Sequence, residues 1–541
     1  MRRLNAERIA AAFGLAVVLG GCTAVLGLDD KVFVDEVAGP GAGGAGGAGG
    51  GAGGGGGAAG AGGGLGGAGG GAGGAGGSGG ACPVVEATGT PGQSLWVQTS
   101  TSSQPASSAG VAVDRCGDVW VVAKFKNDIK VGSCSVQNSK AGEAIVWAKL
   151  DGATGTCKKS GVLGGETIDD FAVPSAIAVD SAGNAIIVGA FKGYLGAGEP
   201  TGASQNGSYD PFVFKLDPDG SSLWLNTWGS NEDDGLGAVA IDPSDDSIVV
   251  AGSIVGSMEI DTLAPVTLVS AGSSDVLLAK LDKDGFSLWA LNFGSSQADE
   301  ARGVTVNGTS GAIGLTGTFT ETISFLGETI STGGVPDVFA ASIDSKGMTC
   351  SFAFTPSSTP SASGLSAAWT GAENKLAVVG ELNGSSTFGM TTLQASSGDS
   401  DSFLALLDPD PKGTHTATRI GQSDPPMATS PDRLEAVAAF PGSKDVLIAG
   451  SFRSTVAVGK QTVTATFDSA DILVARLDES FTAIWARAIG NTFDDGASAA
   501  AVDPATGAPV IGGQFSGTVD FGEKLTASAS PQQIFVLKLA P

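Results

Sequence analysis

Short apolar runs separated by polar turns dominate the chain from about residue 94 onward. In a representative stretch, Ala176–Val179 forms one run, a polar turn follows, and a second run passes a glycine and ends at Phe191. Runs of this length, bounded by Gly, Pro, Asp and Ser, are typical of β-strands, and no long segment shows the helical period of about 3.6 residues. The pattern predicts an all-β protein.

The same unit recurs seven times along the chain. The glycine near the end of its second run stands at Gly189, Gly252, Gly317, Gly380, Gly450 and Gly513, at intervals of 63, 65, 63, 70 and 63 residues. A third run follows, such as Asp210–Asp217, and a tight turn leads to a fourth run with Trp224, Trp289 or Trp485 in one slot. Four short strands in a unit of this length predict the blade of a β-propeller rather than a solenoid coil. We interpret the shared tryptophan slot as packing between blades.

The two ends of the repeat region predict a closed ring. Ser94–Gln98 matches the fourth strand of a unit but precedes the first full unit, whereas the last unit stops after its third strand, Ile534–Leu539. Pairing residues 94–98 with residues 533–539 would close the ring and remove an open sheet edge. We therefore predict a seven-bladed β-propeller over residues 94–541. Six blades with a degenerate unit, or a stacked β-sandwich array, are the alternatives.

The order of an IAVD-type strand, a GN-type turn, a DVFVAKLD-type strand, a DG turn and an LW strand resembles the bacterial β-propeller repeat called SBBP. The resemblance covers about residues 94–541. It is weakest in the fifth unit, where Asp408–Gly413 lengthens a turn and no Trp follows. The resemblance implies the fold of secreted and lipid-anchored proteins, notably of myxobacteria, and it implies no catalytic residues.

The N-terminus has the pattern of an export signal. Basic residues precede the apolar run Ile9–Val18, which is too short for a bilayer span of about 20 residues and has the length of a signal-peptide core. Leu19–Cys22 resembles a bacterial lipobox, which implies a signal peptide over residues 1–21 and acyl chains, palmitate among them, on Cys22. Thr23 replaces the Asp of the usual inner-membrane retention signal, so we expect sorting to the outer membrane.

Residues 39–81, which follow the expected lipidated N-terminus at 22–38, are almost only Gly and Ala. Such a segment cannot bury enough apolar surface to offset its chain entropy, so we expect a disordered tether. It acts as a spacer between lipid and propeller, or it is a neutral low-complexity expansion of a linker.

Charge narrows the class of partner. Acidic residues number 55 and basic residues 29, which gives a net charge of −26. A nucleic-acid-binding protein needs a basic surface, so we expect no nucleic-acid partner. The chain has one histidine, His415, which argues against His-ligated zinc enzymes and against a Ser-His-Asp triad. We interpret His415 as a surface residue.

Acidic pairs precede the first strand of several units. They are Asp169 and Asp170, Asp233 and Asp234, Asp299 and Glu300, and Asp494 and Asp495, with Asp432 and Glu435 nearby in the sixth unit. A ring of these carboxylates would hold Ca²⁺ or attract a cationic ligand. Alternatively, one acid of each unit bonds backbone N–H groups and the other is solvated, which is the interpretation we favour. We expect no cofactor, with Ca²⁺ as the weaker alternative.

Five cysteines remain after Cys22, and export would allow them to form disulfides. Cys82, Cys116, Cys134 and Cys157 lie in the first unit and its approach, so we expect one or two bridges among them. Sequence alone does not give the pairing. We expect Cys350 to be free and buried in a tryptophan slot.

These observations favour a lipid-anchored binding platform in a bacterial cell envelope. The membrane would be contacted through the lipid, and the ligand would be a protein, peptide or glycan. The stretches between second and third strands, such as Gly193–Asp210, are expected to supply specificity. No catalytic motif is present, so we do not expect an enzyme. A carboxylate-based lyase or glycoside hydrolase on the propeller face and a structural envelope component are the alternatives.

Overall fold

A computed structural model describes residues 87–541, except for 139–141, 166, 197–199, 262–264, 372–373, 397–399, 411–412, 423–431, 468 and 523–525. The predicted signal peptide, the lipidation site at Cys22, the tether and Cys82 lie outside the described residues. The regular elements of the described part are β-strands. Within that part, no helix has the length and apolar character needed to cross a membrane.

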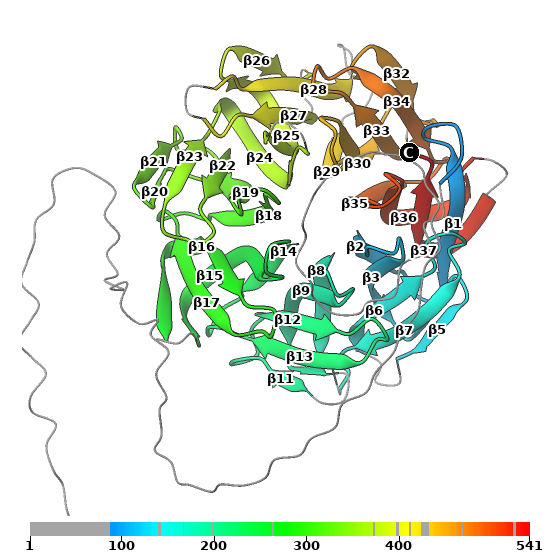
Figure 1. Cartoon of the computed structure of the whole chain (residues 1–541), viewed down its shortest axis with the longest axis horizontal. Coiled ribbons are helices and arrows are strands. Elements are labelled where there is room, and N and C mark those ends of the chain that lie inside the picture. Colours follow the sequence, from blue (N-terminus) through cyan, green and yellow to red (C-terminus); the bar gives the residue numbers. More distant parts are fainter. Residues whose placement is uncertain are drawn as a thin grey trace, which may run out of the picture. The chain divides into compact units, whose positions relative to one another are not determined.

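Groups of four antiparallel strands, which we call blades and name by their first strand, make up the fold and lie around a common centre (Figure 1). The β2 and β8 blades are β2 (Ser107–Val113), β3 (Val119–Lys126), β6 (Glu143–Leu150) and β7 (Cys157–Leu163), then β8 (Phe171–Val179), β9 (Ala185–Lys192), β12 (Asp210–Leu216) and β13 (Ser222–Thr227). The β14 and β18 blades are β14 (Gly235–Ile241), β15 (Ile248–Ile260), β16 (Val266–Leu281) and β17 (Ser287–Phe293), then β18 (Glu300–Val306), β19 (Ile313–Phe319), β22 (Asp337–Ile343) and β23 (Cys350–Phe354). The β24 and β29 blades are β24 (Ser357–Trp369), β25 (Leu376–Phe388), β27 (Ser400–Leu407) and β28 (Thr416–Gln422), then β29 (Arg433–Ala439), β30 (Val446–Phe452), β33 (Asp471–Leu477) and β34 (Ala483–Ile489). The β35 blade is β35 (Gly496–Val502), β36 (Pro509–Asp520), β37 (Thr526–Leu539) and, from the other end of the chain, β1 (Ser94–Ser102).

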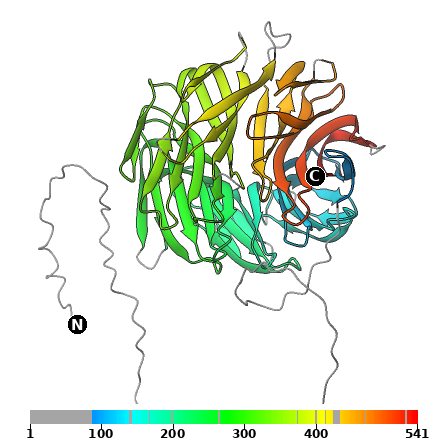
Figure 2. The ribbon, with the colours of Figure 1, turned by 45° about the horizontal axis from the view of Figure 1, so that its top comes forward.

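The first strand of each blade is the innermost and the fourth is the outermost, so the blades stand side by side like those of a propeller (Figures 1 and 2). Buried apolar side chains fill the spaces between neighbouring blades. Val121 and Val146 of the β2 blade, for example, share one cluster with Val510 and Val536 of the β35 blade. This packing follows from the sequence, because a strand that is apolar on both faces needs a neighbouring sheet on each side. The architecture is that of a β-propeller.

The β35 blade contains strands from both ends of the described chain. β1 pairs with β37 in antiparallel register, with Trp96 opposite Lys538. The turn between these strands is made by two separate segments, in which Gly92 N donates to Ala540 O at 2.9 Å and Ala540 N donates to Gln93 O at 2.8 Å. Non-covalent bonds therefore do here what a hairpin loop does in the other blades.

The stretches between second and third strands, for which the sequence predicted a role in specificity but no regular structure, contain β-hairpins. Several are separate strand pairs: β4 (Asp128–Val131) with β5 (Cys134–Gln137), β10 (Tyr194–Gly196) with β11 (Thr201–Ala203), β20 (Thr322–Phe325) with β21 (Glu328–Ser331), and β31 (Thr455–Val458) with β32 (Gln461–Thr464); β26 (Thr391–Gln394) pairs with the end of β25. Their alternating pattern explains the regular structure, because Ile129 and Val131 are buried while Asp128 and Lys130 are exposed. Two hairpins also reach the preceding blade, since β4 pairs with β1 and β31 pairs with β28.

Candidate functional site

The first strands of the blades surround a cavity of about 520 Å³. Most of its lining is backbone and small side chains, such as Gly235, Ala176 and Ala499. All of the first strands contribute to this wall, so the cavity lies on the common centre of the blades. A cavity lined by the ends of many strands is a common location for ligand sites.

A β-bulge interrupts every one of these first strands. The register shifts fall between Ser108 and Gly110, Pro174 and Ala176, Leu236 and Ala238, Ala301 and Gly303, Gly364 and Ser366, Leu434 and Ala436, and Ala497 and Ala499. We call the extra residues the bulge ring: Ala109, Ser175, Gly237, Arg302, Leu365, Glu435 and Ser498. Ser175, Gly237, Arg302, Leu365, Glu435 and Ser498 line the cavity. Bulges commonly re-aim a side chain next to a functional site, and here the bulges of six first strands bring one residue each to the cavity wall.

Five charged side chains gather on one side of the cavity, and we call them the charged wall: Glu300, Arg302, Glu381, Arg433 and Glu435. Arg302 Nε donates to Glu300 Oε1 at 2.6 Å. Arg433 Nε lies 2.8 Å from Glu435 Oε1 and 3.9 Å from Glu381 Oε2. Glu300, Arg302 and Glu435 line the cavity itself. The wall is therefore contributed by three adjacent blades, β18, β24 and β29.

Burial and charged neighbours both act on the carboxyl group of Glu435. Burial raises its pKa above the ordinary glutamate value, and the neighbouring Glu381 raises it further. The positive charges of Arg433 and Arg302 act in the opposite direction. A desolvated carboxylate between two guanidinium groups is suited to binding a charged or strongly polar group, because electrostatic interactions strengthen where water is displaced.

The sequence-predicted acidic pairs occupy the loops between blades. The structure buries Asp234, Asp299 and Asp495 there, and each accepts two backbone hydrogen bonds: from Ser230 N and Val255 N, from Ser295 N and Thr320 N, and from Asn491 N and Ser516 N. Asp170 accepts hydrogen bonds from Thr167 N and Tyr194 N in the same way. These carboxylates join the loop that enters a first strand to the end of the second strand.

The other members of the pairs are separate from one another. Asp169 is exposed, Asp233 accepts a hydrogen bond from Tyr209 N, and Asp494 pairs with Arg453 at 2.9 Å. In the pair Asp299 and Glu300, Asp299 is the repeat equivalent of the buried Asp234. Glu300 is the next residue and begins the strand β18. Among the residues that the structure describes, no group of three or more His, Cys, Asp or Glu side chains is placed to hold a metal ion.

A second row of buried aspartates, which sequence reasoning did not single out as a site, lies on the third strands of five blades: Asp210, Asp275, Asp337, Asp401 and Asp471. Burial raises the pKa of Asp210 and of Asp337 to about 6. Burial also raises the pKa of Asp495, one of the buried loop aspartates described above, to about 7, and the nearby Asp471 adds to this effect. The sequence signal was the aspartate that opens each DVFVAKLD-type strand.

On the opposite edge of the blades, the aspartate of the IAVD-type strand forms a buried ion pair with the lysine of the third strand. The Nζ–Oδ2 distances are 3.0 Å for Lys149–Asp114, 2.9 Å for Lys215–Asp180, 3.0 Å for Lys280–Asp242 and 2.9 Å for Lys538–Asp503. The β29 blade uses Arg476 and Asp445 instead. The recurrence of this pair in separate blades indicates a structural element of the repeat.

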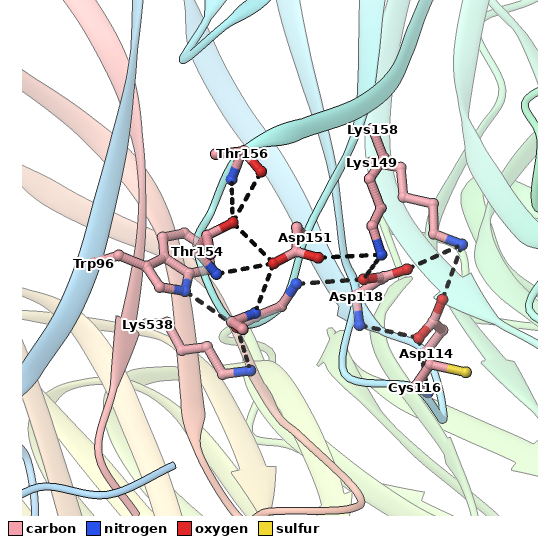
Figure 3. Close-up of polar contacts among 12 residues, drawn as sticks. Trp96, Asp114, Cys116, Asp118, Lys149, Asp151, Thr154, Thr156, Lys158 and Lys538 are labelled. Carbon is pink, nitrogen blue, oxygen red and sulfur yellow. Dashed lines mark hydrogen bonds and ion pairs between the residues drawn. The ribbon is translucent and has the colours of Figure 1, made fainter. Parts of the chain in front are cut away.

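The β2 blade extends this pair into a larger network (Figure 3). Lys158 Nζ lies 2.6 Å from Asp118 Oδ1 and 3.3 Å from Asp151 Oδ2. Burial works to lower the pKa of Lys158, but Asp118 and Asp151 outweigh it and raise the pKa. A lysine with a raised pKa remains a cation and is not suited to act as a base or nucleophile, so we interpret the network as structural.

The same network joins the β35 blade to the β2 blade (Figure 3). Trp96 Nε1 donates to Gly152 O at 3.2 Å, and Lys538 Nζ donates to the same oxygen at 3.0 Å. Trp96 lies on β1 and Lys538 on β37, so both strands of the terminal pair bind the next blade. The contact contributes to assembly rather than to a ligand site.

The remaining singled-out residues take part in packing. Trp224, Trp289 and Trp485 each lie against a positive-φ glycine in the following blade, at Gly285, Gly347 and Gly92. Cys134 and Cys157 form a disulfide with their Cα atoms 5.2 Å apart, Cys116 is also disulfide-bonded, and Cys350 is a buried thiol. His415 is half-buried rather than a surface residue, because its ring packs 4.8 Å from the ring of Phe354.

Sequence reasoning named Glu300 and Glu435 but missed Arg302, Arg433 and Glu381. Aligning the residues after the buried aspartate would have found two of them. In two repeats the first and third residues after this aspartate are small, as in Asp234-Gly-Leu-Gly and Asp495-Gly-Ala-Ser. In two others the same positions are charged, as in Asp299-Glu-Ala-Arg and Asp432-Arg-Leu-Glu. A charge that replaces a small residue at one position of a repeat was the available signal.

Comparison with known proteins gives a distant likeness of fold. No model of a protein family matches the sequence, and no curated protein matches it. Among solved structures, the chain is similar to the WD40 repeats of RRP9 at 9% identity and a TM-score of 0.42, covering 83% of this chain and 99% of that one. It is also similar to the quinohemoprotein alcohol dehydrogenase of Comamonas testosteroni, at 10% identity and a TM-score of 0.38, covering 80% of this chain and 75% of that one. A third similar structure is the NanB sialidase of Streptococcus pneumoniae, at 8% identity and a TM-score of 0.35, covering 84% of this chain and 70% of that one. These proteins include enzymes, and at such identities and scores the likeness says nothing about activity.

Proposed function

We propose that the chain is a lipid-anchored binding protein of a bacterial cell envelope, in which a seven-bladed propeller closed by β1 presents its central cavity to a ligand. The observation that carries this proposal is the bulge ring. Six of the first strands place their bulge residue on the wall of the same cavity, and these residues differ in size, polarity and charge. Variation confined to one ring of inward residues is expected of a binding surface on a fixed scaffold.

Closure is supported by the pairing of β1 with β37 and by the apolar cluster between the β35 and β2 blades. A ring held in this way keeps the first strands at fixed separation, so the cavity is formed before a ligand arrives. A preformed site loses less conformational entropy on binding than a flexible one.

Binding in the cavity is tested with a substitution that fills it. Ser175→Phe places a large ring at a bulge position that lines the cavity. Ser324→Phe, on the exposed outer hairpin β20–β21, is the matched control. The full chain and both variants are screened by thermal shift against amines, amino acids, short peptides and oligosaccharides. Ligands of the cavity should stabilise the wild type and the control but not the filled variant. A ligand that stabilises all three proteins equally would place the binding surface elsewhere.

The anchoring half of the proposal has its own test. Cys22→Ala removes the thiol that the lipobox resemblance assigns to acylation, so the protein should lose palmitate labelling and leave the membrane fraction. A Cys350→Ala variant, which removes a buried thiol far from Cys22 in the sequence, is the control and should remain in the membrane fraction. Unchanged fractionation of the Cys22 variant would refute lipid anchoring.

Glu435 favours one second candidate, a carboxylate-based hydrolase or lyase. Burial raises the pKa of its carboxyl group, and Glu381 is close enough to raise it further, as is seen where one carboxyl acts as an acid and another as a base. In that case Glu435→Gln would abolish turnover of a substrate that still binds. Binding without turnover in the wild type would refute the enzyme.

A further inference from the structure

We propose that the charged wall makes the central cavity a site for small organic cations, with a primary ammonium group as the recognised feature. This inference rests on the proposed binding function and specifies its ligand class. Three adjacent blades bring the five charged side chains together beside an open volume of about 520 Å³. The blades that do not contribute to the charged wall line the cavity mainly with small residues, such as Gly110 and Ser175, which leave room for the ligand.

Charge balance favours a cation. The charged wall holds the carboxylates of Glu300, Glu381 and Glu435 against the guanidinium groups of Arg302 and Arg433, an excess of one negative charge. The chain as a whole carries a net charge of −26, and a concave site in such a protein concentrates cations. An anionic ligand would have to overcome both the local excess and the field of the whole chain.

The pairing within the charged wall points the same way. Both guanidinium groups already contact a carboxylate of their own strand: Arg302 contacts Glu300 at 2.6 Å, and Arg433 contacts Glu435 at 2.8 Å. These contacts use Glu300 Oε1 and Glu435 Oε1. A carboxylate has about four acceptor sites over its two oxygens, so each retains capacity for an ammonium donor. The arginines hold the carboxylates in place and compete mildly with a bound cation.

The cavity strengthens this recognition by displacing water. The carboxyl group of Glu435 is partly withdrawn from water, and Arg302, Arg433 and Glu381 are the charged groups that act on it. An ammonium group bound beside it would replace the lost hydration with a charge-assisted hydrogen bond. Cation binding therefore favours the ionised form of Glu435, so affinity should rise as increasing pH ionises this carboxyl group.

The probe is putrescine, a four-carbon diamine, measured by isothermal titration calorimetry with the full chain at about 0.15 M salt, where diffuse attraction is screened. Butane-1,4-diol and succinate have the same chain length with neutral and anionic ends. Putrescine should bind at least tenfold more tightly than either. Tighter binding of succinate than of putrescine would overturn the assignment.

Variants separate recognition from folding. Glu435→Gln and, at the more exposed position, Glu300→Gln should each weaken putrescine binding about tenfold or more, with urea transitions measured to show that the variants are folded. Glu259→Gln removes the same charge from β15 away from the cavity and should leave binding unchanged. Arg302→Gln should tighten putrescine binding several-fold, because it removes the competing cation.

The outcomes distinguish the two proposals. If Arg302→Gln weakens putrescine binding, or if a neutral or anionic probe binds and responds to the cavity variants, the cation assignment fails while cavity binding stands. If every probe that binds is insensitive to Glu435→Gln, Glu300→Gln and Ser175→Phe, cavity binding itself fails. A putrescine affinity that falls as increasing pH ionises Glu435 would also contradict the role of this residue.

Discussion

The indole of Trp485 lies against Gly92, so closely that a Cβ atom at Gly92 would be 2.9 Å from Trp485 Cδ2. Gly92 has a φ of 78°, a backbone conformation that residues other than Gly rarely adopt. It lies nearly four hundred residues from Trp485 in the sequence, yet it occupies the place that Gly285 and Gly347 take against Trp224 and Trp289 in the other blades. The N-terminal segment therefore completes an inter-blade contact of the repeat.

This contact predicts a loss of stability on Gly92→Ala. The added methyl group must displace Trp485 as well as accept positive φ, so the free energy of unfolding should fall by about 2–4 kcal/mol. Gly207→Ala is the matched control, because Gly207 has a φ of 73° and its added methyl group would have no atom of the described residues within 4 Å beyond its own chain neighbours. It should cost only about 1 kcal/mol. Urea unfolding of both variants checks the difference, and equal losses would show that Trp485 moves without penalty.

The buried ion pair of the β35 blade predicts a second large effect. Lys538→Met leaves Asp503 buried without its cation, so the free energy of unfolding should fall by about 3–5 kcal/mol. Lys283→Met breaks an exposed pair with Asp284 and should leave stability almost unchanged, because an exposed ion pair contributes little. Thermal and urea denaturation measure both. A loss below about 1 kcal/mol for Lys538→Met would mean that water or another donor replaces the lysine.

The disulfide between Cys134 and Cys157 predicts sensitivity to reduction. It closes a loop with a sequence separation of 23, for which the lost chain entropy of the unfolded state corresponds to about 3 kcal/mol. The double variant Cys134→Ser/Cys157→Ser should unfold at correspondingly lower urea, and reductant should shift the wild type in the same direction. Cys350→Ser is the control for loss of a thiol without loss of a bridge. A double variant as stable as the wild type would contradict the contribution of the bridge.

The buried aspartates predict that stability falls as the pH rises from about 4 to about 7. The pKa values of Asp210 and Asp337 are raised to about 6 and that of Asp495 to about 7. A raised folded-state pKa gives stability that is complete below the unfolded value of about 3.9 and is lost as the pH passes the folded value. Burial works to raise the pKa of Asp503, but Lys538 outweighs it and lowers the pKa, so the stability that this residue contributes is complete above about pH 4 and is lost as the pH falls further.

Urea unfolding at pH 4.5, 6 and 8 tests this dependence. Asp495→Asn should flatten the decline, because an amide does not titrate, whereas Asp169→Asn at an exposed position should leave the slope unchanged. Stability that increases steadily from pH 4.5 to pH 8 would show that ion pairs, and not desolvated carboxyl groups, dominate the pH dependence.

The repeat made most strand positions predictable. The expected third run Asp210–Asp217 corresponds to β12 at Asp210–Leu216, because each blade repeats the same alternation of apolar strand and Gly- or Asp-containing turn. The hairpins between second and third strands were missed because their strands are only three or four residues long, and the packing of residues such as Ile129 shows only in the assembled blade.

The candidate site was less predictable than the fold. Whether Arg302 or Glu435 turns towards the cavity depends on which residue is extra in the pairing of two strands, and that register is a property of the pair and not of either sequence. The acidic pairs were visible in the sequence, but their roles differ, since Asp299 bonds backbone amides while Glu300 joins the charged wall. Proximity in the sequence did not indicate a common site.

The bulge in each first strand has an evolutionary consequence. An extra residue stands outside the hydrogen-bonded ladder, so its identity can change without altering how the sheet is paired. Duplication of a gene segment thus multiplies a slot that point mutation is free to rewrite one copy at a time. Arg302, Leu365 and Ser498 show such divergence within a single chain, and new ligand preferences can arise in this way while the folding of the scaffold is inherited unchanged.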